Sequence, residues 1–201
     1  MEFKQSQTLK NLTRAFAGEC QDGAFYQYMA DEATTNKLSY VSTILKQLAT
    51  NEMAHAKVFY DFIGNNVQGG VDMVEIKATY PMKYGKLEDM LKEKAINEDR
   101  QGESVYPEFA KVAEKEGFEE ISKKFIQIGK IEQCHALVLN QLYEKMKNNS
   151  LYSSSTETLW KCFNCGHQDK LKKAWKKCPI CLKNQGMVKI NLELSGRNIE
   201  D

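Results

Sequence analysis

The sequence reads Asn51-Glu52-Met53-Ala54-His55 in the middle of an apolar stripe, and eighty residues later it reads Ile131-Glu132-Gln133-Cys134-His135. Each segment contains a Glu-x-x-His unit, whose carboxylate and imidazole fall on the same side of a helix. Such an ionisable pair is costly to bury unless a partner holds it. A bound metal ion is the partner that this spacing favours, so the two units together predict a metal centre between helices.

Four stretches of the chain have apolar residues at the three-and-four spacing of amphipathic helices, over about residues 5–33, 39–63, 86–116 and 119–147. A lone carboxylate interrupts the first face at Glu19 and the third at Glu98. Pro107 should bend the third helix near Val105–Tyr106. The inner face predicted for this helix consists of Leu87, Leu91, Ala95, Glu98, Val105, Phe109 and Val112.

The connection between the second and third helices is turn-rich and has no period through Tyr80-Pro81. We interpret it as a crossover that lets the third helix run parallel to the second, with room for a short helix of its own. Four long helices with one long crossover are typical of a ferritin-like four-helix bundle. We therefore predict a mainly α fold with a bundle domain over residues 1–147.

A linker is predicted over residues 148–158, which are polar, Ser-rich and without period, so that the following head is tethered but not fixed to its own bundle. The head, residues 159–201, has nine Lys and Arg against four Asp and Glu, a net charge of +5. Residues 1–158 have 19 against 23, a net charge of −4. The two parts are electrostatically complementary, although a solvated lysine face accounts for most of these charges.

Four of the six cysteines form the pairs Cys162-x-x-Cys165 and Cys178-x-x-Cys181 within twenty residues. In a chain without an export signal, this arrangement favours a tetrahedral thiolate metal site over disulfides. The spacing leaves the metal open: iron there would carry single electrons, whereas zinc would be structural. We interpret Cys20 and Cys134 as packing residues and His167 as a surface residue.

Composition sets the remaining limits. A chain of 201 residues that is 42% hydrophobic is long enough for one buried core and a small appendage. The net charge of +1 gives no argument for a nucleic-acid or membrane-surface partner, and no apolar run approaches the length of a membrane span. Residues 1–5 lack the apolar core of a secretory signal, so we expect a cytoplasmic or equivalent reducing compartment.

A Glu from each of two helices, combined with Glu-x-x-His from each of the other two, is the ligand pattern of di-iron and di-manganese carboxylate proteins. Its four carboxylates neutralise two ferrous ions, or two ferric ions joined by an oxide bridge. The buried site could therefore change oxidation state, which fits redox chemistry with oxygen species, and its hard donors favour iron or manganese over zinc. The candidate ligands are Glu19, Glu52, His55, Glu98, Glu132 and His135.

Together with their flanking motifs, these residues resemble the rubrerythrin family over essentially the whole chain. The cysteine-containing tail resembles the rubredoxin-type head of that family, which carries iron. The matching stretches are residues 15–19 (Ala-Phe-Ala-Gly-Glu), 52–57 (Glu-Met-Ala-His-Ala-Lys), 106–110 (Tyr-Pro-Glu-Phe-Ala), 116–118, 132–135, 160–166 and 178–181.

The resemblance implies a non-haem peroxidase that reduces hydrogen peroxide to water, with two iron ions in the bundle and one at the four cysteines, where zinc is a possible substitute. Electrons would come from a nicotinamide-dependent flavoprotein reductase or a small rubredoxin-like carrier. Tyr26 and Tyr106 match tyrosines that hydrogen-bond the site carboxylates. The family forms head-to-tail homodimers or higher oligomers, in which one subunit's head serves the other's bundle.

One position departs from the family pattern, which has a further glutamate one turn after the third-helix ligand, as an alternative ligand for a moving iron. Here that position is Gln101, a weaker ligand, and Glu103 should point elsewhere. Either four carboxylates suffice or the peroxidase cycle is impaired. Two alternatives therefore stay open: a ferritin-like ferroxidase or iron-binding protein without efficient peroxidase turnover, and a helical scaffold with a zinc ribbon for partner binding.

Overall fold

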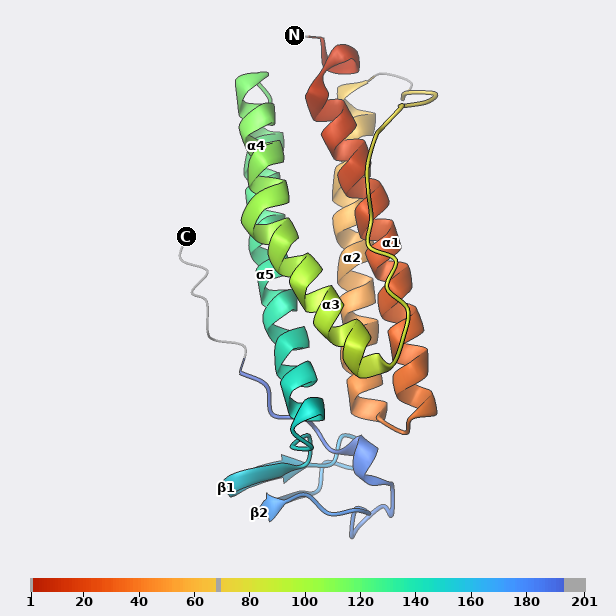
Figure 1. Cartoon of the computed structure of the whole chain (residues 1–201), viewed down its shortest axis with the longest axis vertical. Coiled ribbons are helices and arrows are strands. Elements are labelled where there is room, and N and C mark those ends of the chain that lie inside the picture. The colour runs from red at the N-terminus through yellow and green to blue at the C-terminus, as the bar shows by residue number, and fades with distance from the viewer. Residues whose placement is uncertain (1, 68–69, 194–201) are drawn as a thin grey trace.

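Two antiparallel helical hairpins lie side by side in the computed structural model, which describes residues 2–67 and 70–193 (Figure 1). The first hairpin consists of α1 (Gln7–Thr35) and α2 (Ser39–Asn66). The second consists of α3 (Leu87–Arg100), a π-helical segment η2 (Gln101–Val105), α4 (Tyr106–Lys115) and α5 (Glu119–Lys147). This mainly α, ferritin-like bundle confirms the predicted fold class.

The two hairpins turn in the same way. The chain passes through the left-handed region at Lys37 (φ 60°) in the first hairpin and at Gly117 (φ 89°) in the second. In each turn the next amide donates 2.8 Å back to the preceding helix, from Leu38 to the Ala33 carbonyl and from Phe118 to that of Ala113. These bonds satisfy carbonyls at the ends of α1 and α4.

The crossover returns the chain along α1 from one end of the bundle to the other, so α3 runs parallel to α2 as predicted (Figure 1). The hydroxyl of Tyr80 holds it there through a 2.8 Å hydrogen bond to the Arg14 carbonyl. The short helix allowed for is not present in residues 70–86, the described part of the crossover. A helix rises only about 1.5 Å per residue, whereas extended chain covers about 3.3 Å and can span α2.

The third helix differs most from its prediction, because η2 interrupts it before Pro107. The π-helical turn takes in one extra residue and so rotates the following face. Val105 and Val112, both predicted to face inward, are only half-buried, while Tyr106 and Ala113 are buried. A bend was predicted from the proline, but not this shift of register.

Gly102 allows η2 to approach α5 closely. A Cβ at this position would collide with the backbone carbonyl of Gly129 and the side chain of Gln133. No other residue type could therefore occupy position 102 without moving one of the two elements apart.

The head begins earlier than predicted, because β1 (Ser153–Lys161) pairs antiparallel with β2 (Gln168–Lys173). The predicted linker of residues 148–158 is therefore too long: its Ser-rich half is extended and pairs with β2, for example Ser153 with Lys173. Residues 194–201, the end of the predicted 159–201 domain, lie outside the described residues.

The head is also packed against its own bundle. Ile190 lies in one apolar cluster with Leu45 and Leu139, and the ring centroids of Phe163 and Tyr40 are 5.4 Å apart. A Cβ at Gly186 would collide with the Lys37 carbonyl at the α1–α2 turn. In the described residues the head is thus fixed at the end of the bundle, contrary to the prediction of a loose tether.

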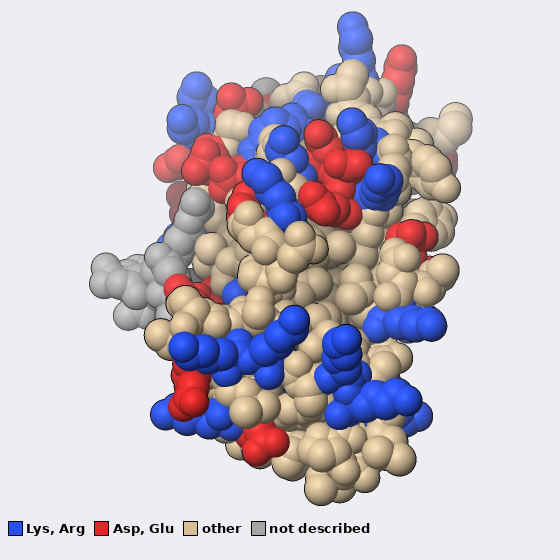
Figure 2. Space-filling model, turned by 60° about the horizontal axis from the view of Figure 1, so that its bottom comes forward, with Lys and Arg blue, Asp and Glu red and all other residues tan. Residues whose placement is uncertain are grey.

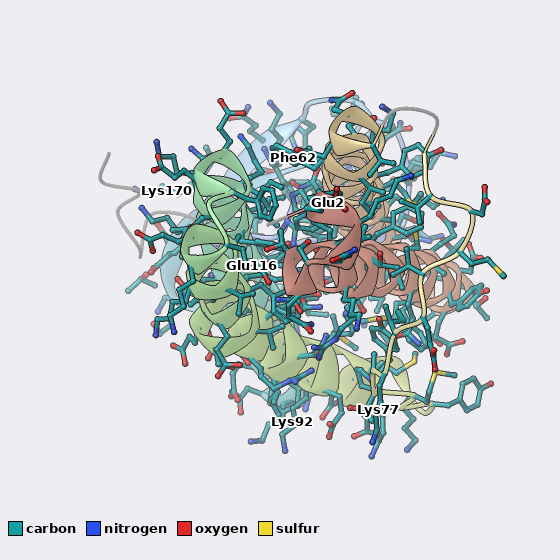
Figure 3. The ribbon with its side chains drawn as sticks, turned by 90° about the horizontal axis from the view of Figure 1, so that it is seen from above. Glu2, Phe62, Lys77, Lys92, Glu116 and Lys170 are labelled. Atoms are coloured by element: carbon teal, nitrogen blue, oxygen red, sulfur yellow. The ribbon has the colours of Figure 1, made fainter. Side chains whose placement is uncertain are left out.

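At the opposite end, Glu116 joins the second hairpin to the start of α1 (Figure 3). Its carboxylate accepts hydrogen bonds from the amides of Gln7 (2.9 Å) and Thr8 (2.8 Å) and from the Thr8 hydroxyl (2.6 Å). The Ser6 hydroxyl accepts a further bond, 3.0 Å long, from the Leu9 amide. Together they satisfy backbone donors that a helix N-terminus leaves free.

Two apolar clusters fill the bundle, one near the head around Leu45 and Leu91 and one near the far end around Phe59 and Phe125. The predicted ligands are buried charged or polar side chains that belong to neither cluster. Among the described helices, none has the length and apolar character needed to cross a membrane.

Candidate metal centres

All six predicted ligand side chains of the bundle converge on one buried site. Their donor atoms form two groups, each with all atoms within 4.8 Å of one another. Glu52 and Glu132 belong to both groups. The first group consists of Glu19, Glu52, His55 and Glu132, and the second of Glu52, Glu98, Glu132 and His135.

The two shared glutamates each offer one oxygen to each histidine. Nδ1 of His55 lies 2.9 Å from Oε1 of Glu132 and 3.4 Å from Oε2 of Glu52. Nδ1 of His135 lies 2.9 Å from the other oxygen of both carboxylates. Glu19 completes the first group, with Oε2 3.4 Å from the same nitrogen of His55. This arrangement has two ion positions bridged by two carboxylates.

The donor set fits two divalent iron ions. Eight buried oxygen and nitrogen atoms of these six ligands have no hydrogen bond of good geometry within the described residues and only approach one another closely, a state that is costly unless something is bound there. These atoms are Oε2 of Glu19 and Glu98, both carboxylate oxygens of Glu52 and Glu132, and Nδ1 of His55 and His135.

Protons compete with metal for the histidines. Burial lowers the pKa of both imidazoles, but the surrounding carboxylates outweigh it and raise the pKa of His55 to about 12 and that of His135 to about 10. Burial also raises the pKa of Glu52, while hydrogen bonds from both histidines bring it well below its usual value. A metal ion must displace these imidazole protons, so binding should strengthen as pH rises.

Both predicted tyrosines contact the site, and each reaches the opposite hairpin. The Tyr26 hydroxyl donates to Oε1 of Glu98 at 2.6 Å, and the Tyr106 hydroxyl donates to Oε1 of Glu19. Burial raises the pKa of both phenols well above the ordinary value, so they stay protonated donors. Each tyrosine occupies one oxygen of its glutamate and leaves Oε2 for a metal ion.

Sequence reasoning missed a buried ion pair beside Glu98. Nζ of Lys94 lies 2.6 Å from Oδ1 of Asp22 and 3.0 Å from Oε1 of Glu98. Gln101 donates its amide to the other Asp22 oxygen at 2.9 Å. The signal was present, because Lys94 is one turn before Glu98 and Asp22 one turn after Glu19, on the same helix faces.

Lys94 and Asp22 form an ionised pair. Burial lowers the pKa of Lys94, but its two carboxylate neighbours outweigh this and raise it. Burial is the largest influence on Asp22 and raises its pKa above the usual value, although Lys94 and Gln101 act to lower it. Because both Asp22 oxygens accept hydrogen bonds from these donors, the carboxylate form is the one that the geometry favours.

The four predicted cysteines also come together. Sγ of Cys162 lies 3.6 Å from that of Cys181, and Sγ of Cys165 lies 3.6 Å from that of Cys178. Four sulfurs at about 2.3 Å from one ion would be about 3.8 Å apart in a tetrahedron, whereas a disulfide needs about 2 Å. The cluster fits a thiolate metal site, iron included.

His167, Cys20 and Cys134 lie outside the two candidate metal sites, and His167 is less exposed than predicted. His167 is half-buried, with its ring centroid 5.1 Å from that of Trp175 and Nε2 3.0 Å from Asp169. Cys20 and Cys134 are half-buried and belong to neither ligand group.

The geometry agrees with the comparison to known proteins. The family model for rubrerythrin matches residues 10–92 and 89–164. The chain belongs to the rubrerythrin family. It is 35% identical to a rubrerythrin of Clostridium perfringens over 189 residues, which cover 94% of this chain and 96% of that protein.

Solved structures show the same fold at lower identity. A nigerythrin in a partially reduced state matches with a TM-score of 0.61 and 23% identity over 93% of this chain and 90% of that one. A bacterioferritin of Desulfovibrio desulfuricans matches with a TM-score of 0.58 and 23% identity over 72% of this chain and 82% of that one. This chain is therefore a rubrerythrin-type protein whose two clusters fit iron.

Proposed function

We propose that this rubrerythrin-family protein is a peroxidase that reduces hydrogen peroxide to water with two electrons and two protons per molecule. The observation that carries the proposal is the pairing of two centres in one chain, a carboxylate–histidine site for two ions and a separate thiolate site. Iron bound in the bundle would supply electrons and a Lewis acid to the peroxide.

The protein side chains would bind the two ions, orient the terminal glutamates and shield the site from water. Glu52 and Glu132 belong to both donor groups and would hold both ions, while the buried phenols fix Glu19 and Glu98 by one oxygen each. The two apolar clusters close the bundle and exclude bulk water from the charged layer. Tyr106 keeps its proton at the phenolic oxygen and donates it to Glu19 beside the site.

A polar cavity of about 80 Å³ supports access for a small substrate. It lies under the crossover at Tyr80, and its wall includes Asp22, Gln101 and Tyr106. A volume of this size has room for a few water-sized groups, and hydrogen peroxide is a molecule of that size.

Electrons are proposed to enter through the cysteine cluster, from a flavoprotein reductase or a rubredoxin-like carrier. Cys165 is exposed, and so are the neighbouring apolar side chains Ile180 and Leu182. Lysines gather over this end of the molecule (Figure 2), which favours a donor with an acidic surface. Unoxidised thiols of this kind suit a reducing compartment such as the cytoplasm.

We also propose a head-to-tail homodimer or a higher oligomer. A groove between the head and the bundle has His135 and Asn51 in its wall together with the apolar side chains Ile44 and Val138. The Asn51 amide nitrogen lies 3.4 Å from Nε2 of His135, so this wall reaches a candidate ligand. A second copy's head placed over it would approach the carboxylate centre.

One observation favours the alternative, a ferroxidase or iron-binding protein without efficient peroxidase turnover. Gln101 stands where the family has an extra glutamate, and its amide is engaged with Asp22. An amide held in this way is a poor alternative ligand for an iron that must move.

Peroxide consumption by the iron-loaded chain, driven by an added reductase system, separates the two functions. The peroxidase consumes peroxide faster than free iron does, and Cys178→Ser removes the reductase-driven turnover while the bundle keeps its iron. Rapid oxygen consumption with slow peroxide consumption would establish the ferroxidase. A colourless protein with zinc at the cysteines and no metal in the bundle would leave only the scaffold.

A further inference from the structure

The two ion positions in the bundle are alike in ligands but not in their surroundings. Each has one terminal glutamate, one histidine and the two bridging glutamates. Lys94 contacts the terminal ligand of the second position, Glu98. At the matching place in α1, one turn before Glu19, the chain has Ala15.

Lys94 is an integral part of the site rather than a surface residue. Its side chain is 8% exposed, and its ammonium lies 5.0 Å from the centre of the Tyr26 ring. It shares Oε1 of Glu98 with the Tyr26 hydroxyl, so this oxygen already accepts from two donors. Only Oε2 is left for a metal ion, and a fixed positive charge stands behind it.

Asp22 partly balances that charge, but from further away. Its carboxylate contacts Lys94 and Gln101, and no contact joins it to a candidate ligand within the described residues. The pair therefore forms a dipole whose positive end contacts Glu98. In a buried site such a dipole acts on a bound ion with little screening.

We infer that Lys94 is a positioning residue that makes the two ion positions unequal, so that the position formed by Glu19 and His55 fills first and the one formed by Glu98 and His135 binds its ion more weakly. The inference rests on the proposed di-metal site. It goes beyond that function by stating which ion is labile and which residue makes it so.

Manganese titration of the full chain, with the head already loaded with iron, tests this inference without measuring turnover. Mn²⁺ suits carboxylate donors and competes poorly for thiolates. We expect two calorimetric steps whose dissociation constants differ by about tenfold or more. At one equivalent, anomalous scattering from crystals should place the ion between Glu19 and His55.

Charge-removing variants of Lys94 and Asp22 should change the affinity of the second manganese step in opposite directions, which general damage to packing would not do. Lys94→Met leaves the negative charge of Asp22 near the site and should tighten the second step by about tenfold. Asp22→Asn leaves the ammonium alone and should weaken it. The double variant should lie between the wild type and Lys94→Met. Lys92→Met, a matched control on an exposed lysine of α3 (Figure 3), should change neither step.

Two results would overturn the inference. One is a second step that moves in the same direction in Lys94→Met and Asp22→Asn, and the other is a Lys94→Met titration that equals that of Lys92→Met. If Lys94→Met does not fold, the double variant, which removes both charges together, must still tighten the second step. A wild-type bundle that binds no manganese and no iron overturns the proposed function itself, which distinguishes the two failures.

Discussion

The first hairpin, α1 and α2, and the second, α3 to α5, supply equivalent residues to the carboxylate centre at a nearly constant offset in sequence. Glu19 and Glu98 are 79 residues apart, whereas Tyr26 and Tyr106 are 80 apart. The second hairpin therefore has one extra residue between its glutamate and its tyrosine. The π-helical segment 101–105 lies in that interval.

The difference shows how an irregular turn can preserve a regular site. In a straight α-helix, an eighth residue would be rotated about 100° from the seventh and would point away from the partner hairpin. The wide turn of η2 absorbs this rotation, so Tyr106 reaches Glu19 as Tyr26 reaches Glu98. A local departure from α-helical geometry is thus what keeps the two halves equivalent at the ligands.

The largest expected effect comes from the equivalent bridging ligands. Glu52→Gln and Glu132→Gln each remove a carboxylate shared by both ion positions, so each should lower the affinity of the bundle for metal by more than about 100-fold. Metal analysis per chain measures this, and the absorption of the head's iron should stay unchanged. Glu120→Gln, on an exposed residue of α5, is the control. Full metal content in one of the two variants would break the equivalence.

Gly23 and Gly102 occupy equivalent positions, four residues after the terminal glutamates, and should respond unequally. Gly102→Ala collides with the Gly129 backbone and should lower the free energy of unfolding by about 3 kcal/mol. A Cβ at Gly23 meets the flexible Met53 side chain at 3.2 Å, so Gly23→Ala should change stability by about 1 kcal/mol or less. Denaturant unfolding measures both changes in the free energy of unfolding, and equal losses in the two variants would contradict the close approach of η2 to α5.

The tyrosines test whether the extra residue leaves the two halves equal in function. Tyr26→Phe and Tyr106→Phe each remove a hydrogen bond to a terminal glutamate, so each should reduce metal affinity or turnover by about 10- to 100-fold. Stepwise metal titration of both variants measures the effect. If only one variant is impaired, the reciprocal arrangement of the hairpins does not extend to their chemistry.

The smallest expected effect is a difference in stability between substitutions at the ends of α4 and α1. Glu116 caps α1 through three hydrogen bonds, whereas the equivalent Asn36 contacts only its own helix within the described structure. Glu116→Gln should cost about 1 kcal/mol of unfolding free energy at neutral pH, and Asn36→Ala clearly less. Thermal unfolding measures both, and a larger loss for Asn36→Ala would reverse the comparison.

This effect should depend on pH in a defined direction. Burial raises the pKa of Glu116, but the donors of Thr8 and Gln7 outweigh it and lower the pKa below its usual value. A depressed folded pKa contributes stability above the unfolded value of about 4.3, and that stability is lost as pH falls through the folded value. The difference between the wild type and Glu116→Gln should therefore vanish in strong acid.

Sequence periodicity was enough to predict the four helical stretches, the crossover direction and the six converging ligands, because each of these follows from which residues share a helix face. Residues 119–147 were predicted with the bounds that α5 has. The four cysteines were predictable from a single local motif, since two short loops bring them together.

The rest depended on interactions that no local pattern records. Pro107 predicts an interruption but not an inserted residue, so the inner face was assigned to Val105 instead of Tyr106. The Ser-rich stretch after Tyr152 resembles a linker until β2 supplies its hydrogen-bond partners. A lysine on a helix is usually solvated, and it is Asp22 on another helix that makes the burial of Lys94 possible.

Because the head is packed against the α1–α2 turn at Gly186, the effect of dilution on turnover can show whether electrons reach the carboxylate centre within one chain or between chains. A head on a free tether would visit its own bundle at an effective concentration set by the tether. A docked head has one fixed distance to its own carboxylate centre and other distances to its neighbours in an assembly. Turnover per chain should then stay constant on dilution if electrons move within a chain, and should fall once oligomers dissociate if they move between chains.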